Sequence, residues 1–163
     1  MRLSIYPDRG LVVTVPNRVA VERALDLVSS KADWIIKKLD VFAASPVIPR
    51  LTKKDFSLHK ERALEAVSGR LRRIATFYQV NHRKVFIRDQ KSRWGSCSKK
   101  GNLSFNFKIV FLPPHLADYL VVHEVCHLLE FNHSDRFWQL VAQTMPEHKK
   151  HRKELKLLGR SLI

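Results

Sequence analysis

The chain has 163 residues, 45% of them hydrophobic, which is enough apolar material for one ordinary globular domain with its own core. It has no apolar run of transmembrane length, and its first residues lack the apolar stretch and cleavage site of a signal peptide. Two cysteines are too few for a disulfide framework, so the composition disfavours a disulfide-stabilised secreted domain and we expect a cytoplasmic protein.

The charge balance is strongly basic, with 30 Lys and Arg against 15 Asp and Glu and a formal net charge of +15. A basic surface attracts polyanions, so contact with nucleic acid is a secondary hypothesis. A solvated basic surface without a functional partner would have the same composition, because net charge bears on association and not on fold.

The first 56 residues are predicted to form an N-terminal segment. Apolar residues alternate over residues 2–15 around a turn at Pro7-Asp8-Arg9-Gly10, which is typical of a β-hairpin. Helical spacing follows over residues 19–42 and indicates two helices with a break near Ser29-Ser30.

Two further features complete this first half. Ser30 and Asp33 have the spacing of a capping box at the start of the second helix. Residues 43–56 contain two prolines and mixed polar residues, and they are predicted to be a linker. A long amphipathic helix is then expected over residues 57–79.

The second half is predicted to combine short strands with helices. The expected elements are a strand at 84–88, a turn-like segment at 91–98, a strand at 102–110, a helix at 115–129, a helix from Ser134 to about Gln143 and a last helix after Pro146. If the strand at 102–110 is an edge strand, it can pair with an extended peptide. A small, mostly antiparallel sheet packed on helices makes this an α+β fold.

The predicted helix at 115–129 carries a metal-binding motif. His123 and His127 are four residues apart and lie on one helix face, where both imidazoles can point at a single ion. Glu124 can face a water on that ion, and His133 can supply a third ligand from the turn after the helix. Three ligands leave an open fourth position, which is typical of catalytic zinc. We therefore expect one Zn²⁺ per chain and hydrolysis with Glu124 as general base.

Two points stay open at this level. A structural zinc closed by Cys126 is the alternative, but position 126 is turned about 100° around the helix axis from His127 and about 300° from His123. A donor that stabilises the transition state cannot be chosen from the sequence. The candidates are His148, Arg93, His151 and Tyr119.

Further residues around the motif resemble a known family. They are Arg93-Trp94-Gly95-Ser96-Cys97-Ser98, Gly101-x-Leu103-x-Phe105-Asn106, Asp118-Tyr119, His123-Glu124-x-Cys126-His127-Leu128, Asn132-His133-Ser134-x-x-Phe137-Trp138 and Met145-Pro146. With this pattern the chain resembles the YgjP-like zinc metallopeptidases, with SprT- and Spartan-type proteases as more distant relatives. The resemblance is close over residues 84–158.

The resemblance implies a compact zincin-like catalytic domain over residues 57–163, forming one compact unit with the N-terminal segment. It also implies that His123, His127 and His133 bind zinc and that Glu124 is the catalytic base. Relatives often carry Tyr where this chain has His148, and they often have a longer segment in place of residues 43–56.

Three functions are therefore compared. The first is a zinc-dependent metallopeptidase that acts on a peptide or protein substrate. The second is a zinc hydrolase of a nucleotide phosphoanhydride or another small anionic substrate. The third is a nucleic-acid-binding domain with a structural zinc, which the presence of Glu124 argues against because a structural site needs no general base. The sequence does not predict an oligomeric state.

Overall fold

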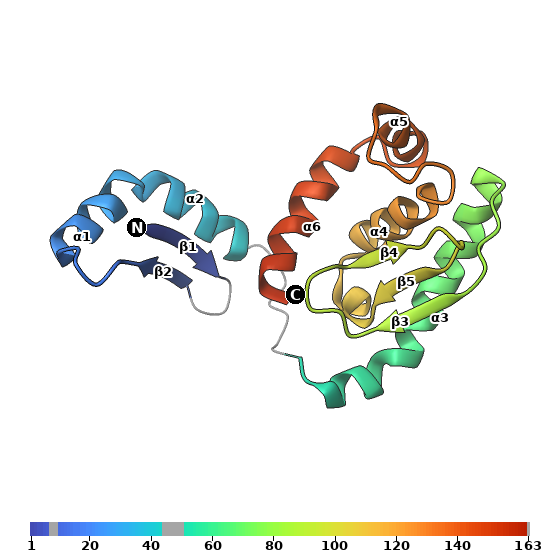
Figure 1. The fold of residues 1–163 in the computed structure, drawn as a ribbon, viewed down its shortest axis with the longest axis horizontal. Helices are drawn as coiled ribbons and strands as arrows, with labels where there is room; N and C mark the ends of the chain where they lie inside the picture. Colours follow the sequence, from blue (N-terminus) through green and yellow to red (C-terminus); the bar gives the residue numbers. More distant parts are fainter. Residues whose placement is uncertain (7–9, 44–50, 163) are drawn as a thin grey trace. The chain divides into compact units, whose positions relative to one another are not determined.

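The computed structural model describes residues 1–6, 10–43 and 51–162 (Figure 1). The chain divides into two compact units, Met1–Pro49 and Arg50–Ile163. Within the described residues, no helix is both long and apolar enough to cross a membrane.

The first unit contains the predicted hairpin and two helices. Strands β1 (Arg2–Tyr6) and β2 (Gly10–Thr14) pair antiparallel, and helices α1 (Val21–Ser30) and α2 (Ala32–Ala43) follow. The predicted turn lies mostly outside the described residues, because residues 7–9 are among those not described.

At the break between α1 and α2, the Ser30 side chain makes a different hydrogen bond from the one predicted. Ser30 is the last residue of α1, and its hydroxyl donates to the carbonyl oxygen of Leu27 at 2.9 Å. The predicted capping box of Ser30 and Asp33 is therefore wrong. A serine hydroxyl near a helix end readily bonds back to its own helix, and here this bond competes with capping of the next helix.

Helix α3 (Lys53–Tyr78) begins four residues before the predicted start. Asp55 Oδ2 accepts hydrogen bonds from the backbone N–H and the hydroxyl of Thr52, both at 2.7 Å. This capping interaction fixes the first turn, so residues 53–56 are helical and not part of a linker. Residues 44–50, the rest of the predicted linker, lie outside the described residues.

The second unit has a three-stranded sheet in the order β3-β5-β4. Strand β3 (Val85–Arg88) pairs parallel with β5 (Leu103–Asn106), and β4 (Gly95–Cys97) pairs antiparallel with β5. Among the described strands, two of the three pairings are antiparallel. This small sheet and its helices confirm the α+β fold class.

Three local predictions in this region are wrong. Residues 91–98 are not only a turn, because Gly95–Cys97 forms β4. The strand predicted to reach residue 110 ends at Asn106, and a 3₁₀ helix, η1 (Phe107–Phe111), follows. The Asn106 side chain accepts from the Lys108 backbone N–H at 3.2 Å and so caps this turn. Finally, β5 is the central strand, so it is not an edge open to a peptide.

Helix α4 (Pro114–Cys126) is the centre of the second unit. It contacts α3, β4, α5 (Asp135–Thr144) and α6 (His148–Leu162) (Figure 1). Its residues are apolar around most of the helix, and such a helix is stable only when other elements cover it. The helix was predicted to extend to residue 129 but ends at Cys126, with His127 as the cap residue.

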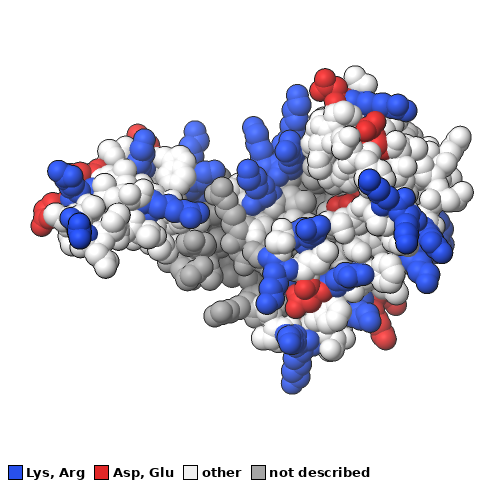
Figure 2. Space-filling view, in the orientation of Figure 1, with Lys and Arg blue, Asp and Glu red and all other residues white. Residues whose placement is uncertain are grey.

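Lys and Arg are the most frequent charged residues on the surface. Figure 2 shows their side chains spread over the face drawn, with Asp and Glu more sparse. Helix α6 contributes several exposed cations, which are Lys149, Lys150, Arg152, Lys153 and Lys156.

Candidate active site

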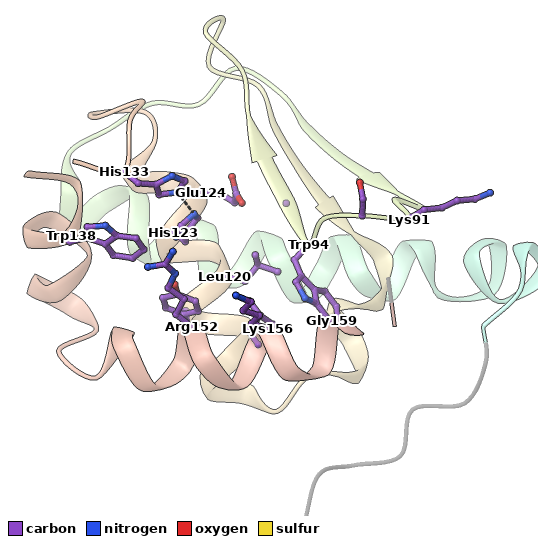
Figure 3. A pocket seen from close by; sticks show the side chains of 14 residues that line it. Lys91, Trp94, Leu120, His123, Glu124, His133, Trp138, Arg152, Lys156 and Gly159 are labelled. Carbon is purple, nitrogen blue, oxygen red and sulfur yellow. Dashed lines mark hydrogen bonds between the residues drawn. The ribbon is translucent and has the colours of Figure 1, made fainter. Parts of the chain in front are cut away.

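Three imidazoles meet beside the end of α4. His123 lies in the last turn of the helix, His127 caps it, and His133 comes from the loop before α5. One nitrogen of each ring lies within 4.8 Å of the others. The Nε2 atoms of His123 and His133 are 3.0 Å apart (Figure 3). The structure therefore brings together the three histidines that the sequence singles out.

Neighbouring groups fix the orientation of these rings. His127 Nδ1 lies 3.1 Å from the carbonyl oxygen of Glu130, which can only accept, so Nδ1 carries the proton and Nε2 has the free lone pair. Phe137 stacks on His127 with 4.5 Å between ring centroids, and Trp138 stacks on His133 at 5.6 Å. These residues come from α5, so the position of α5 controls the metal-facing side of the site.

The histidines are held in their neutral form. Burial, together with the positive charges that His127, His133 and Arg152 can carry, lowers the pKa of His123 to about 3. Burial also lowers the pKa of His127 and of His133. Neutral imidazole is the form that binds a metal ion, so the donor set is ready for a cation near neutral pH.

Glu124 lies next to the histidines in a confined position. Its side chain is 4% exposed, and Oε2 is buried without a hydrogen-bond partner among the described residues. Gly95 of β4 faces it so closely that a Cβ there would lie 2.6 Å from Glu124 Oε1. The carboxylate is therefore held between α4 and the edge strand of the sheet.

The charge state of Glu124 depends on what occupies the site. Burial raises the pKa of its carboxyl to about 8, although the charge of Arg93 acts in the opposite direction. A cation at the three imidazoles would favour the ionised carboxylate and bring this pKa down. Three neutral imidazoles beside a buried carboxyl with an unpartnered oxygen are a donor set that fits a divalent metal ion.

A cavity of about 650 Å³ lies beside this group (Figure 3). His123, Glu124 and His133 form one part of its wall. The rest of the wall contains small and aliphatic residues together with aromatic and basic ones, which are Trp94, Tyr119, Trp138, Lys91, Arg152 and Lys156. The Arg152 guanidinium lies 4.8 Å from the centre of the Trp138 ring, so this cation is held at the cavity beside the histidines.

The four candidates for a transition-state donor differ in their position relative to the cavity. Among the described residues that line the cavity, Tyr119 is the one candidate present, and its ring lies 5.9 Å from that of His123. His148 stacks on Trp138 and borders a different pocket. His151 is buried beside Tyr119, and Arg93 is exposed.

Sequence reasoning missed the contribution of α6 and of Gly95. Arg152, Leu155, Lys156 and Gly159 of α6 all line the cavity. Their spacing of three and four residues is that of one helix face, so this stripe was visible in the sequence. Nothing in the sequence assigned the stripe to the cavity, because the packing of α6 on α4 decides which face is turned inward.

A family model for the YgjP-like metallopeptidase domain matches residues 49–157, two thirds of the chain. The protein belongs to the YgjP-like family. This membership makes it a metal-dependent hydrolase of the metallopeptidase class and agrees with the resemblance seen in the sequence.

A solved structure supports the fold of this YgjP-like protein. The metallopeptidase zymogen abylysin of Pyrococcus abyssi is similar, with 23% sequence identity and a TM-score of 0.52 over 60% of this chain and 99% of that chain. The metallopeptidase zymogen jannalysin of Methanocaldococcus jannaschii gives 22% identity and a TM-score of 0.48 over 56% and 93% of the two chains. No curated protein sequence matches the chain.

Proposed function

We propose that this protein is a zinc-dependent peptidase in which His123, His127 and His133 hold the zinc and Glu124 is the general base. The observation that carries the proposal is the convergence of three neutral imidazoles next to a buried, unpartnered carboxyl oxygen, beside a cavity that His123, His133 and Glu124 line. Three imidazole ligands suit zinc, and an adjoining cavity gives room for water and substrate. A structural site would not need the carboxyl group or the cavity.

In the proposed reaction, the zinc and Glu124 have separate roles. Bound zinc would supply Lewis acidity and make water nucleophilic near neutral pH. As water adds to the peptide carbonyl carbon, Glu124 Oε2 takes its proton. Glu124 then gives that proton to the amine nitrogen as the C–N bond breaks. Gly95 supports this role because its missing side chain leaves the space that the Glu124 carboxyl occupies.

A donor for the developing oxyanion is available at the cavity wall. Burial raises the pKa of the Tyr119 hydroxyl to about 12, so it keeps its proton at neutral pH and can donate a hydrogen bond. Arg152 is the second candidate, because it lines the same cavity and carries a permanent charge. We favour Tyr119 and Arg152 because they line this cavity. His148 and Arg93, which are not among its lining residues, stay predictions, and the charge of Arg93 acts on Glu124.

Strand β4 is the edge at which we place the substrate backbone. It lies at one end of the sheet order, so its outer side has no strand neighbour among the described residues. An extended peptide can add to such an edge through main-chain hydrogen bonds. Gly95 lies in β4 and touches Glu124, so a peptide paired with this strand would pass beside the base.

Replacing Glu124 with Gln is the direct test. The variant keeps the size of the side chain and removes the base, so kcat/KM on a casein-like protein should fall about 10²–10⁴-fold. Bound zinc, measured by atomic absorption after dialysis, should remain stoichiometric. Glu65→Gln, an exposed change on α3, serves as the matched control and should be fully active.

Two results would contradict the proposal. If the wild-type chain binds no stoichiometric metal, the assignment of the three histidines is wrong. If Glu124→Gln cleaves protein as fast as the wild type, the metal site stands but the assigned base does not.

Hydrolysis of a small anionic substrate is the second candidate function. Lys91, Arg152 and Lys156 border the cavity, and Glu124 is the one acidic residue among those that line it. Such a wall attracts phosphate groups as well as acidic peptides. Nucleoside triphosphates assayed beside the protein substrate decide between the two, since phosphate release with an inert protein substrate would favour this candidate.

Surface charge and free thiols bear on the partner and the compartment. The exposed cations of α6 and the net charge of +15 support additional contact with nucleic acid near the cavity. Cys97 and Cys126 are both free thiols, which fits work in the reducing cytoplasm.

A further inference from the structure

A second group of potential metal ligands lies between α4 and α6. His115, His151 and Glu154 each offer a ligand atom, and these atoms lie within 4.8 Å of one another. His115 Nε2 is 3.1 Å from Glu154 Oε2. None of the three residues belongs to the set at His123, and the proposed catalytic reaction uses none of them.

The spacing of these atoms resembles that of the first site. Ligands around a tetrahedral zinc with bonds of about 2.0 Å lie roughly 3.3 Å from one another. The His115–Glu154 distance of 3.1 Å and the His123–His133 distance of 3.0 Å are both close to this value. A pair of imidazoles with one carboxylate is also a ligand set found in zinc proteins.

His151 makes the group more than a surface ion pair. Its side chain is 9% exposed, and its Nδ1 is buried without a hydrogen-bond partner among the described residues. Its ring lies 5.2 Å from that of His115 and 6.0 Å from that of Tyr119. Burying an unpaired polar atom is unfavourable, so the position of His151 is better explained by a ligand shared with its two neighbours.

The positions of the three residues in the fold indicate what such a site would do. His115 is in the first turn of α4, whereas His151 and Glu154 are three residues apart on one face of α6. A shared ion would therefore join the two helices. Arg152 lies next to His151 in the chain and lines the cavity, so fixing α6 also fixes the position of that cation.

The two groups are too far apart to form a binuclear centre. His115 and His123 are eight residues apart on α4, which corresponds to about 12 Å along the helix axis. Metal ions that act together on one substrate are roughly 3.5–4 Å apart. The ring of Tyr119 lies near both groups, 5.9 Å from His123 and 6.0 Å from His151.

We propose that His115, His151 and Glu154 form a second zinc site, in which the ion clamps the first turn of α4 to α6 and thereby holds the basic wall of the cavity. Water completes the coordination, because the group offers three protein ligands. The ion at this site takes no part in bond cleavage, and its binding does not depend on the identity of the substrate.

The experiment measures zinc stoichiometry on the full chain. The protein is stripped with a chelator and titrated with ZnCl₂ by isothermal titration calorimetry, and thermal unfolding is followed at each zinc level. The wild type should bind two equivalents, and the second should raise Tm. The double variant His115→Ala with Glu154→Gln should bind one equivalent and lose that second rise in Tm. Both substitutions are at partly exposed side chains, so the variant is expected to fold.

Two control variants separate this site from the first site and from adventitious binding. The pair His123→Ala and His127→Ala should lose the tighter equivalent and keep the one at α6, which makes failure of the proposed function distinguishable from failure of this inference. His59→Ala, on α3, should keep both equivalents.

The proposal is overturned by any of three results. The wild type could bind a single equivalent with no second step, the double variant could keep the second equivalent, or His59→Ala could abolish it. In each case His115 and Glu154 would form an ordinary hydrogen-bonded pair beside a buried histidine.

Discussion

At the scale of single residues, the site depends on one close contact between a strand and a helix. Gly95 of β4 lies against the carboxyl group of Glu124, and a Cβ at Gly95 would be 2.6 Å from Oε1 and 2.8 Å from Cδ. Real Cβ atoms do not approach other atoms so closely, so any larger residue must displace the carboxyl group. The position of the proposed base is therefore controlled by a residue that has no side chain.

Gly95→Ala should reduce activity without removing the metal. A displacement of about 1 Å at a reacting group can cost roughly 10²-fold in rate, so we expect kcat/KM to fall by that order. Zinc content should be unchanged, because the atoms nearest to a Cβ at Gly95 belong to Glu124 and not to the three histidines. Steady-state peptidase assays with zinc analysis measure both quantities.

Gly69→Ala is the matched control for this substitution. Gly69 lies within α3, and nothing lies within 4 Å of a Cβ built there. Alanine in a helix interior stabilises by about 0.5–1 kcal/mol relative to glycine, so this variant should be fully active and somewhat more stable. Full activity of Gly95→Ala would show that Glu124 tolerates displacement.

At the scale of elements, capping interactions determine where the site-bearing helices begin. Ser134 Oγ accepts a hydrogen bond from the Phe137 backbone N–H at 3.3 Å and starts α5, as the sequence predicts. Ser134 directly follows His133, so the cap that starts the helix also fixes the backbone of the third proposed ligand. Phe137 and Trp138 in the first turn then stack on the histidine rings.

Ser134→Ala should therefore lower both stability and zinc affinity. Loss of an N-cap hydrogen bond costs about 1 kcal/mol in the free energy of unfolding. Release of the first turn of α5 should also weaken binding at His133. Urea unfolding and competition with a zinc chelator measure the two effects. Ser57→Ala, an exposed change within α3, is the control and should alter neither stability nor zinc affinity. An unchanged zinc affinity in Ser134→Ala would mean that the cap does not position His133.

The capping interaction of α3 predicts a pH-dependent contribution to stability. Hydrogen bonds from the Thr52 hydroxyl and backbone N–H lower the pKa of Asp55 below its ordinary value of 3.8. A group with a lowered folded-state pKa stabilises the fold above its unfolded pKa, and the contribution is lost as pH falls through the folded value. Asp55→Asn should therefore lower Tm at neutral pH.

The difference in Tm between Asp55→Asn and the wild type should shrink as the pH falls below 3.8. Thermal melts followed by circular dichroism across this range measure it. Glu61→Gln removes the same charge from an exposed position on α3 and should show no comparable difference. A constant difference in Tm at all pH values would mean that the carboxylate charge is not what stabilises the helix start.

At the scale of the whole molecule, the site belongs to one of the two compact units. The second unit, Arg50–Ile163, contains the residues that line the cavity and both histidine groups. It also contains nearly all of the family match at 49–157. The first unit, Met1–Pro49, is compact in itself. Its hairpin and two helices have a small apolar interior of their own, which includes Ile5, Ala24 and Ile35.

The segment Arg50–Ile163 should consequently fold and bind zinc when produced alone. Its helices and sheet make their contacts within the segment, so we expect a cooperative thermal transition and the same zinc stoichiometry as the full chain. Circular dichroism and zinc analysis of the purified segment test this. An unfolded or aggregated product would mean that the first unit covers a surface the second unit needs.

Much of the site was predictable because its signals are local. The four-residue spacing of His123 and His127 puts both rings on one helix face wherever that helix packs. Ser134 is a strong N-cap residue, and the start of α5 follows from it. The hairpin and most helices were also predicted, because alternating and helical apolar patterns extend over many residues.

Other features depend on partners far away in the chain, so only the tertiary structure decided them. The strand β4 is Gly-Ser-Cys, which is too short for a periodic pattern and becomes a strand because it pairs with β5. Asn106 ends β5 because its side chain bonds to Lys108 N–H and to the distant Gln90 carbonyl. The basic wall exists because α6 packs on α4 with Arg152 turned inward. The sequence by itself predicted the proposed ligands and the proposed base from their spacing along the chain, whereas packing between elements decided the cavity, its charge and the room for Glu124.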